Sequence, residues 1–185
     1  MIDVLIIGAG VVGCITARAL SRYKLNVLII DKASDVSEGA TKANSGIVHA
    51  GYDAKPNTLK AKLNLSGNAM MKNLTQELSV EYSNTGSLVT AFDENQLNHL
   101  KILYDRGIKN GVPHLELIKS KDKLHELEPE LNDDVIGALH APTAGIVCPW
   151  GLAEAACENA IENGVELITE AEVVSIEKKN KGFIV

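Results

Sequence analysis

The sequence has no long apolar run, no cluster of basic residues and no paired-cysteine motif. No apolar stretch approaches the ~18 residues that a membrane-spanning helix needs, so we expect no transmembrane segment. Met1 is followed directly by an apolar strand pattern, without the basic region that opens a signal peptide. These absences predict a cytoplasmic protein, and peripheral attachment to a membrane stays open.

Cysteine is scarce, and its spacing excludes the common metal and disulfide motifs. The only cysteines are Cys14, Cys148 and Cys157, an odd number without a C-x-x-C pair. A reducing compartment fits this usage best. We therefore expect all three to be small core residues and predict no metal site.

Positive charge is also limited. The 185 residues include 18 Lys and Arg against 24 Asp and Glu, a formal net charge of -6. Nucleic-acid binding needs clustered basic side chains, so no nucleic-acid partner is expected. Hydrophobic residues make up 45% of the chain, which suits one globular domain, or one domain and part of another.

The start of the chain has the pattern of a βαβ unit. Residues 3–7 form a short continuous apolar run, as a buried parallel strand does, and residues 26–30 form a second. A glycine-rich stretch and a helix pattern over residues 11–23 lie between them. This order predicts two parallel strands joined by a helix.

The stretch over residues 8–13 matches G-x-G-x-x-G in the strand-to-helix context that gives the motif meaning. Its glycines permit a tight turn, close approach of a pyrophosphate, and close packing of helix on strand. The helix N-terminus adds N–H donors and partial positive charge. An acid that ends the second strand can accept hydrogen bonds from a ribose. The predicted dinucleotide-binding residues here are Gly8, Ala9, Gly10, Val11, Val12, Gly13, Asp31 and Lys32.

Residues 32–53 are rich in small and polar residues and have little periodicity. An irregular segment of this length is usually functional or disordered. Thr41, Asn44 and Ser45 offer short polar groups to a bound ligand such as a phosphate, beside Gly46. Histidine is the residue type whose free side chain changes charge near neutral pH, so His49 could steer a substrate anion or act as a base. The alternative is a packed, hydrogen-bonded histidine without chemical duty.

The rest of the chain alternates helix and strand patterns. Asn57 or Thr58 can cap a long helix. Helices are also predicted over residues 93–110, from Ser120 to near Pro129, and over residues 151–163. Predicted strands cover residues 86–91, 115–118, 135–140, 165–168, 172–177 and 183–185, the last two joined by a turn at residues 179–182.

Two motifs carry a resemblance to known proteins. Residues 3–31 resemble the FAD fingerprint of glutathione-reductase-like flavoproteins. Residues 39–51, with an N-S-G-x-x-H-A-G stretch, resemble the second cofactor segment of the D-amino-acid-oxidase-like family, and within it the branch of glycerol-3-phosphate dehydrogenases and L-2-hydroxyglutarate oxidases. The resemblance implies FAD as cofactor, with this stretch along the pyrophosphate and the inner edge of the isoalloxazine ring.

A later segment extends the resemblance. Residues 142–149 lead into an Ala-rich helix and then to residues 164–176, which is similar to the family segment that returns from the substrate domain. In that segment the backbone of a valine hydrogen-bonds the adenine, and Val173 is the matching position. The alternative is an ordinary hairpin strand.

The resemblance predicts an α/β fold: a glutathione-reductase-like FAD-binding Rossmann domain with the start of a mixed α+β substrate domain. We expect a discontinuous FAD domain over residues 1–80 and 140–185, and a substrate or cap region over residues 81–139. Asp31 stands where the family more often has glutamate, and the family's closing glycine pair and acid are absent. We therefore expect more than half of a complete enzyme to lie beyond Val185.

The expected reaction is hydride transfer to flavin from a carbon that carries a hydroxyl group, on a small anionic substrate. By resemblance the substrate is sn-glycerol 3-phosphate, with L-2-hydroxyglutarate and then an amino acid as alternatives. The electron acceptor stays open between a quinone, an iron–sulfur protein and oxygen. Two rival classes remain: a non-catalytic dinucleotide-binding module, and a pyridine-nucleotide dehydrogenase, because NAD and FAD share the glycine-loop half of the site.

Overall fold

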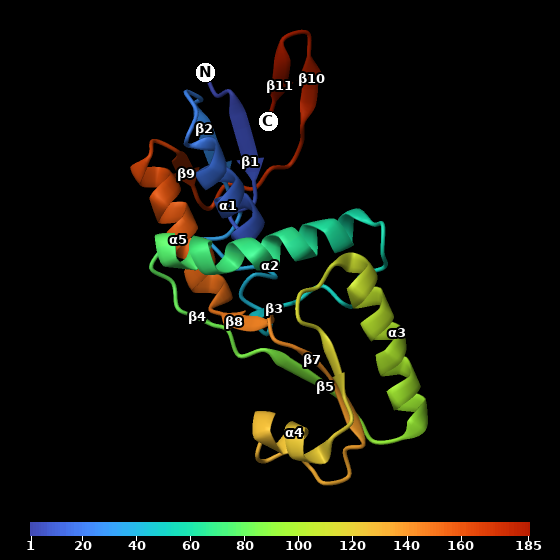
Figure 1. Cartoon of the computed structure of the whole chain (residues 1–185). Helices are drawn as coiled ribbons and strands as arrows, with labels where there is room; N and C mark the ends of the chain where they lie inside the picture. The colour runs from blue at the N-terminus through green and yellow to red at the C-terminus, as the bar shows by residue number, and fades with distance from the viewer. The chain divides into compact units, whose positions relative to one another are not determined.

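The computed structural model describes residues 1–185 and divides the chain into two compact units (Figure 1). The first unit contains Met1–Gly46, Thr75–Glu81 and Cys148–Val185. The second contains Ile47–Leu74 and Tyr82–Val147. Each unit has its own apolar core, and each is described by itself.

The first unit is built on a parallel sheet of order β1-β2-β9. Its strands are β1 (Val4–Ile7), β2 (Val27–Ile30) and β9 (Glu166–Ile168). Helix α1 (Val11–Leu20) connects β1 to β2, and these two strands pair in parallel register from Val4 with Val27 to Ile7 with Ile30. The predicted βαβ unit is therefore confirmed, although the helix ends before residue 23.

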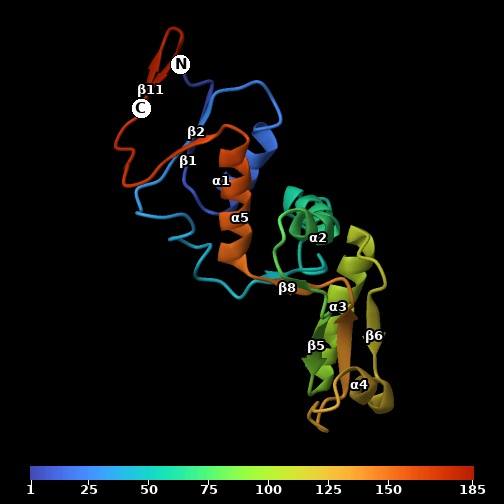
Figure 2. The same cartoon turned by 90° about the vertical axis from the view of Figure 1, so that its left-hand side faces the viewer.

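Helix α5 (Pro149–Glu162) packs closely along α1, and Figure 2 shows the two helices side by side. Their contact is made by small side chains, which let the two backbones approach each other. Ile29 of β2 completes this core from the sheet. The fully or almost fully buried members at the helices are Cys14, Ala17, Ala153, Ala156, Cys157 and Ala160.

Two of the three cysteines are core residues, as predicted. The hydrogen bond with Cys157 and burial raise the pKa of the Cys14 thiol, so Cys14 stays neutral. Cys148 differs, because it is only partly buried and caps α5: its Sγ accepts from the Gly151 N–H at 3.4 Å. Pro149 then fits the first helical turn, which starts α5 two residues before the predicted residue 151.

The strand predicted over residues 172–177 is wrong. Residues 171–176 have no regular structure, and strand β10 (Glu177–Lys179) only begins where the prediction ended. It pairs antiparallel with β11 (Gly182–Ile184) across the predicted turn, and Figure 2 shows this hairpin standing apart from the parallel sheet. The alternating pattern failed because no neighbouring strand is there to pair with; Val174 is 88% exposed.

The second unit contains an antiparallel sheet of order β5-β7-β6 covered by a helix. The strands are β5 (Ser87–Ala91), β7 (Gly137–Ala141) and β6 (Glu116–Ile118). Helix α3 (Glu94–Asn110) packs on them through leucines at helical spacing, which include Leu97 and Leu100. The Asp93 side chain caps its start, so the helix begins one residue later than predicted, and Gly111, at φ 85°, ends it directly after the predicted last residue 110. The short helix α4 (Lys121–Leu127) starts after Ser120, also as predicted.

A second, smaller sheet of order β3-β8-β4 was not predicted. It pairs β3 (Ile47–Val48), β8 (Gly145–Val147) and β4 (Tyr82–Ser83), which are too short to show a periodic pattern. Helix α2 (Leu59–Glu77) follows β3 along the chain, and the Thr58 hydroxyl accepts from the Ala61 N–H, so Thr58 is its cap. No helix of the chain combines the length and apolar character needed to cross a membrane.

The packing of the chain does not follow the predicted division at every boundary. Residues 47–74 belong to the second compact unit, whereas the predicted FAD domain includes them. The predicted division is based on cofactor binding and not on packing. That residues 1–80 and 140–185 together hold the cofactor stays a prediction.

Candidate cofactor site

The glycine loop between β1 and α1 has a backbone that only glycine permits at two places. Gly8 has φ 108°, a conformation that side chains rarely adopt. A Cβ on Gly13 would lie 2.0 Å from the carbonyl oxygen of Gly8, so helix and strand are in direct backbone contact there. A Cβ on Gly10 would lie 3.0 Å from the Thr41 Oγ1, so this position also has little room.

The start of α1 presents N–H groups with few partners. The first N–H groups of any helix have no acceptor inside the helix. Here the Val11 N–H donates to the Thr41 Oγ1 at 3.0 Å, which places Thr41 beside the loop as predicted. Val12 is 78% exposed and leaves the helix start open. The open N-terminus is suited to an anion.

Asp31 lies directly next to the loop. Its Oδ2 accepts from the Ala9 N–H at 2.6 Å and its Oδ1 from the Ala33 N–H at 2.8 Å. The N–H groups of Ala33 and Ala9 hold the pKa of the Asp31 carboxyl below its usual range, so it is ionised near neutrality. A carboxylate has about four acceptor positions, so it can hold the loop and still accept from a ribose.

The predicted loop residues converge on one cavity. It has a volume of about 530 Å³ and an apolar rim with a few polar groups. The cavity combines three features: a glycine cradle that any Cβ would narrow, an open helix start and an ionised acid. Together they fit the pyrophosphate and ribose of a dinucleotide. The lining includes Gly8, Gly10, Val11, Val12, Gly13, Asp31, Lys32 and Thr41.

Val173 lies close to the same loop. It lines a cavity of about 250 Å³ together with Gly8, Asp31 and Lys32. The irregular backbone of residues 171–176 makes this possible, since Ala171 N–H donates to the Asp31 carbonyl and leads the chain past the end of β2. The position predicted to meet an adenine thus lines the same cavity as Asp31, even though the strand predicted there is absent.

Asn44 stabilises the loop that follows Thr41. Its Oδ1 accepts from the Gly46 N–H at 2.8 Å, and its Nδ2 donates to the carbonyls of Thr41 and Ala40. Gly46 has φ 66° and is buried, whereas Ser45 is exposed. Asn44 therefore uses its polar atoms on the protein backbone, and Ser45 presents its hydroxyl to the outside.

His49 belongs to the second unit, in contrast to the residues above. It is exposed and lines a cavity of about 490 Å³ with Gly51, Tyr52, Lys60 and Asn64. The hydrogen bonds of His49 within the chain are made by its backbone carbonyl. A chemical role for its imidazole stays a prediction, as does the packed alternative.

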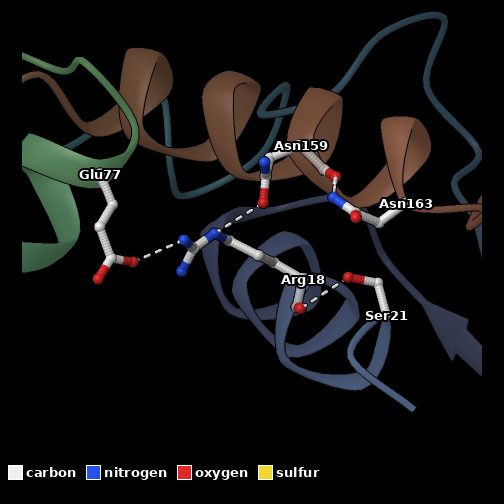
Figure 3. Close-up of polar contacts among 5 residues, drawn as sticks. All are labelled: Arg18, Ser21, Glu77, Asn159 and Asn163. Atoms are coloured by element: carbon white, nitrogen blue, oxygen red, sulfur yellow. Dashed lines mark hydrogen bonds and ion pairs between the residues drawn. The ribbon is translucent and has the colours of Figure 1, made fainter.

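A polar network that no sequence pattern indicated holds α1 in the first unit (Figure 3). Arg18, near the end of α1, donates from Nη2 to Glu77 Oε2 at 2.8 Å and from Nε to Asn159 Oδ1 at 3.0 Å. Asn163 donates to the Asn159 carbonyl at 2.7 Å, and the Ser21 hydroxyl donates to the Arg18 carbonyl. The partners of Arg18 are far away along the chain, so no local spacing could reveal them.

A parallel βαβ unit with a glycine cradle and an ionised acid at the end of its second strand defines a dinucleotide-binding domain. The chain belongs to the DAO family of FAD-dependent oxidoreductases, whose family model matches residues 3–185. FAD is the cofactor of this enzyme family, so the predicted family, fold class and cofactor are confirmed at this level.

Two relatives are similar to the chain over most of its length. The chain is 54% identical over 183 residues to a glycerol 3-phosphate dehydrogenase of Caloramator mitchellensis, covering 99% of this chain and 38% of the relative. It is 37% identical over 147 residues to a mitochondrial L-2-hydroxyglutarate dehydrogenase of Dictyostelium discoideum, covering 78% of this chain and 33% of the relative.

Solved structures show the same fold. A dithionite-reduced L-alpha-glycerophosphate oxidase from Mycoplasma pneumoniae with FAD bound is 31% identical, with a TM-score of 0.91 over 98% of this chain and 48% of that one. A glycine oxidase from Geobacillus kaustophilus is 26% identical, with a TM-score of 0.88 over 98% of this chain and 50% of that one. The chain spans half or less of the length of these proteins.

Proposed function

We propose that the protein binds FAD at the glycine loop and oxidises sn-glycerol 3-phosphate. The glycine cradle beside an ionised acid supports the cofactor half of this proposal. The identity of 54% to a glycerol 3-phosphate dehydrogenase supports the substrate. Bound flavin supplies a two-electron acceptor for a hydride.

The residues of the chain take distinct parts in this proposal. The backbone of Gly8 to Gly13 at the start of α1 receives the pyrophosphate, and Asp31 accepts from the ribose hydroxyls. The backbone of Val173 meets the adenine, beside Lys32. Thr41 keeps the Val11 N–H oriented, and Asn44 keeps its loop closed. Ser45 and Gly46 border the flavin.

His49 is the candidate catalytic residue. As an exposed imidazole at a cavity that also contains Lys60, it can attract an anionic substrate and accept the hydroxyl proton while the carbon-bound hydrogen leaves as hydride. The second task requires a neutral imidazole, because only that form has a nitrogen lone pair free to accept a proton.

The deciding experiment is anaerobic reduction of the flavin-loaded protein by candidate substrates. Glycerol 3-phosphate should bleach the visible flavin absorption, and His49→Ala should slow bleaching by about 10²-fold or more with the FAD content unchanged. If glycerol 3-phosphate leaves the flavin oxidised and L-2-hydroxyglutarate bleaches it, the second substrate replaces the first; its support is the 37% identity to an L-2-hydroxyglutarate dehydrogenase. An amino acid that alone bleaches the flavin would point to the third alternative.

Re-oxidation then distinguishes the acceptors. Reduced protein mixed with oxygen, a quinone or an iron–sulfur protein should recover its oxidised spectrum fastest with the physiological class of acceptor. A protein that never retains flavin but binds NADH would contradict the whole proposal.

A further inference from the structure

The carbonyl of His49 is held by two asparagines of α2. Asn64 Nδ2 donates to the His49 carbonyl oxygen at 3.1 Å, and Asn68 Nδ2 donates to the same oxygen at 3.2 Å. The two asparagines are four residues apart, so they lie on one face of the helix. Asn68 also donates to the Thr143 carbonyl at 2.8 Å. One backbone oxygen therefore has two side-chain donors, which is unusual for a segment without regular structure.

The residues that follow His49 are held in the same way from α3. Asn110 Nδ2 donates to the carbonyls of Gly51 and Ala54 at 2.9 and 2.7 Å. Arg106 Nη1 donates to the Asp53 carbonyl at 2.6 Å. Side chains thus replace the ladder that a strand or helix would provide, and the segment keeps one conformation without belonging to either.

The consequence for His49 follows from backbone geometry. His49 follows β3, whose residues Ile47 and Val48 are held by β8. Holding the next carbonyl as well restricts the two backbone rotations at His49, so the direction of its Cα–Cβ bond is restricted and the imidazole keeps mainly its own side-chain rotations. His49 and Asn64 both line the cavity of about 490 Å³. Asn64 and Asn68 are therefore placed to act on the ring through the backbone.

We propose that Asn64 and Asn68 are positioning residues that aim the His49 imidazole into this cavity. The kinetic part of the proposal rests on the proposed function of His49, whereas the orientation of the ring does not. Carboxamides suit this positioning role because each has two N–H donors and no charge that would alter the electrostatic environment of the imidazole.

A kinetic test uses the flavin-loaded protein and a double-mutant cycle. Asn64→Ala with Asn68→Ala should lower the rate of flavin reduction at saturating substrate about tenfold or more, since small misplacements of a reacting group are costly. In a His49→Ala background the same pair should have no further effect. An equal loss in both backgrounds would overturn the proposal, because the asparagines would then act on the fold and not through His49.

The matched control is Asn84. It makes the same kind of contact in the same unit, donating to the carbonyls of Pro142 and Ala144 at 2.7 and 2.8 Å, but it does not contact residues 49–54. Asn84→Ala should change stability by a similar amount and leave the rate of flavin reduction unchanged. A matching loss of rate in Asn84→Ala would count against a specific role for Asn64 and Asn68.

A second test needs no substrate. In an NMR titration, the ring signals of His49 should shift in the Asn64→Ala, Asn68→Ala pair and stay unchanged in Asn84→Ala. If the His49 signals are unchanged in the double variant, the positioning proposal is overturned, even if glycerol 3-phosphate bleaches the flavin. If the signals shift, the positioning proposal is supported, even if no substrate bleaches the flavin. Asn68→Leu, which has about the same size but neither a donor nor a charge, is the variant to use if the alanine pair does not fold.

Discussion

At the scale of single residues, Gly13 decides whether α1 can lie against β1. Gly13→Ala places a methyl group 2.0 Å from the Gly8 carbonyl, so the helix start must move away from the strand. We expect a loss of about 1–3 kcal/mol in the free energy of unfolding, as for other overpacked sites, together with loss of FAD binding. Urea denaturation and flavin retention measure the two effects.

Gly39→Ala is the matched control, because nothing lies within 4 Å of the Cβ it would add. Gly39 should accept the change with a small gain or no change in stability. Equal stability of the two variants would show that the close contact with Gly8 is not the reason why position 13 requires glycine.

Asp31 is the residue whose charge should make stability depend on pH. The Ala33 and Ala9 N–H groups lower the folded-state pKa of Asp31. Its contribution to the free energy of unfolding is therefore fully present above the unfolded-state pKa of about 3.9. That contribution is lost as the pH falls through the lower folded-state pKa. Asp31→Asn should therefore cost about 1–3 kcal/mol at pH 7 and progressively less below about pH 4.

Denaturation at several pH values checks this prediction. Asp105→Asn is a suitable control, because the Asp105 carboxylate has no hydrogen bond or ion pair. A cost of Asp31→Asn that stayed constant down to pH 2 would show that the lost interaction is not that of a carboxylate.

At the scale of elements, Arg18 joins α1 to α5 and to the end of α2 (Figure 3). Only 14% of its side chain is exposed, whereas 56% of the Glu77 side chain is. Arg18→Met should therefore destabilise the protein by about 1–2 kcal/mol, since Asn159 also loses its partner. Glu77→Gln should change stability little, because exposed ion pairs contribute little.

The order of the two variants in urea denaturation tests this interpretation. Raising the salt concentration should weaken the small effect of Glu77→Gln and leave most of the Arg18→Met effect. Equal losses in both variants would mean that the ion pair, and not the hydrogen bond to Asn159, stabilises the contact between the helices.

At the scale of the whole molecule, the first unit exposes much apolar surface. The hairpin residue Phe183 is 67% exposed, and Ile7 and Ile168 of the parallel sheet are 52% and 47% exposed. Parallel sheets are normally covered on both faces, and exposed edge strands pair readily with other chains. We therefore expect the 185-residue chain to self-associate as its concentration rises.

Sedimentation analysis of Phe183→Lys tests this expectation. The variant should shift association to higher concentration, because a charge at an exposed edge opposes pairing. Ile102→Lys is the control, since Ile102 is 55% exposed but lies on α3, outside the first unit. The same shift in both variants would mean that general charge, and not the hairpin, controls association.

Much of the first unit could be predicted because its signals are local. The G-x-G-x-x-G stretch, the two apolar runs and Asp31 are close in sequence, and strand, loop and helix follow from backbone rules that act over a few residues. The caps Thr58 and Ser120 are local for the same reason. The choice of family rests on the same local motifs, and the family comparison confirms it.

Only the tertiary structure decided the features that join distant parts of the chain. Residues 171–176 have a strand pattern but no neighbour to pair with, so they stay irregular. The two-residue strand β3 forms because β8, about a hundred positions later, supplies its hydrogen bonds. The partners of Arg18 and the two asparagines on the His49 carbonyl are likewise set by which helices meet. A sequence fixes local backbone preferences directly, but hydrogen-bond partners far along the chain exist only after the core has formed.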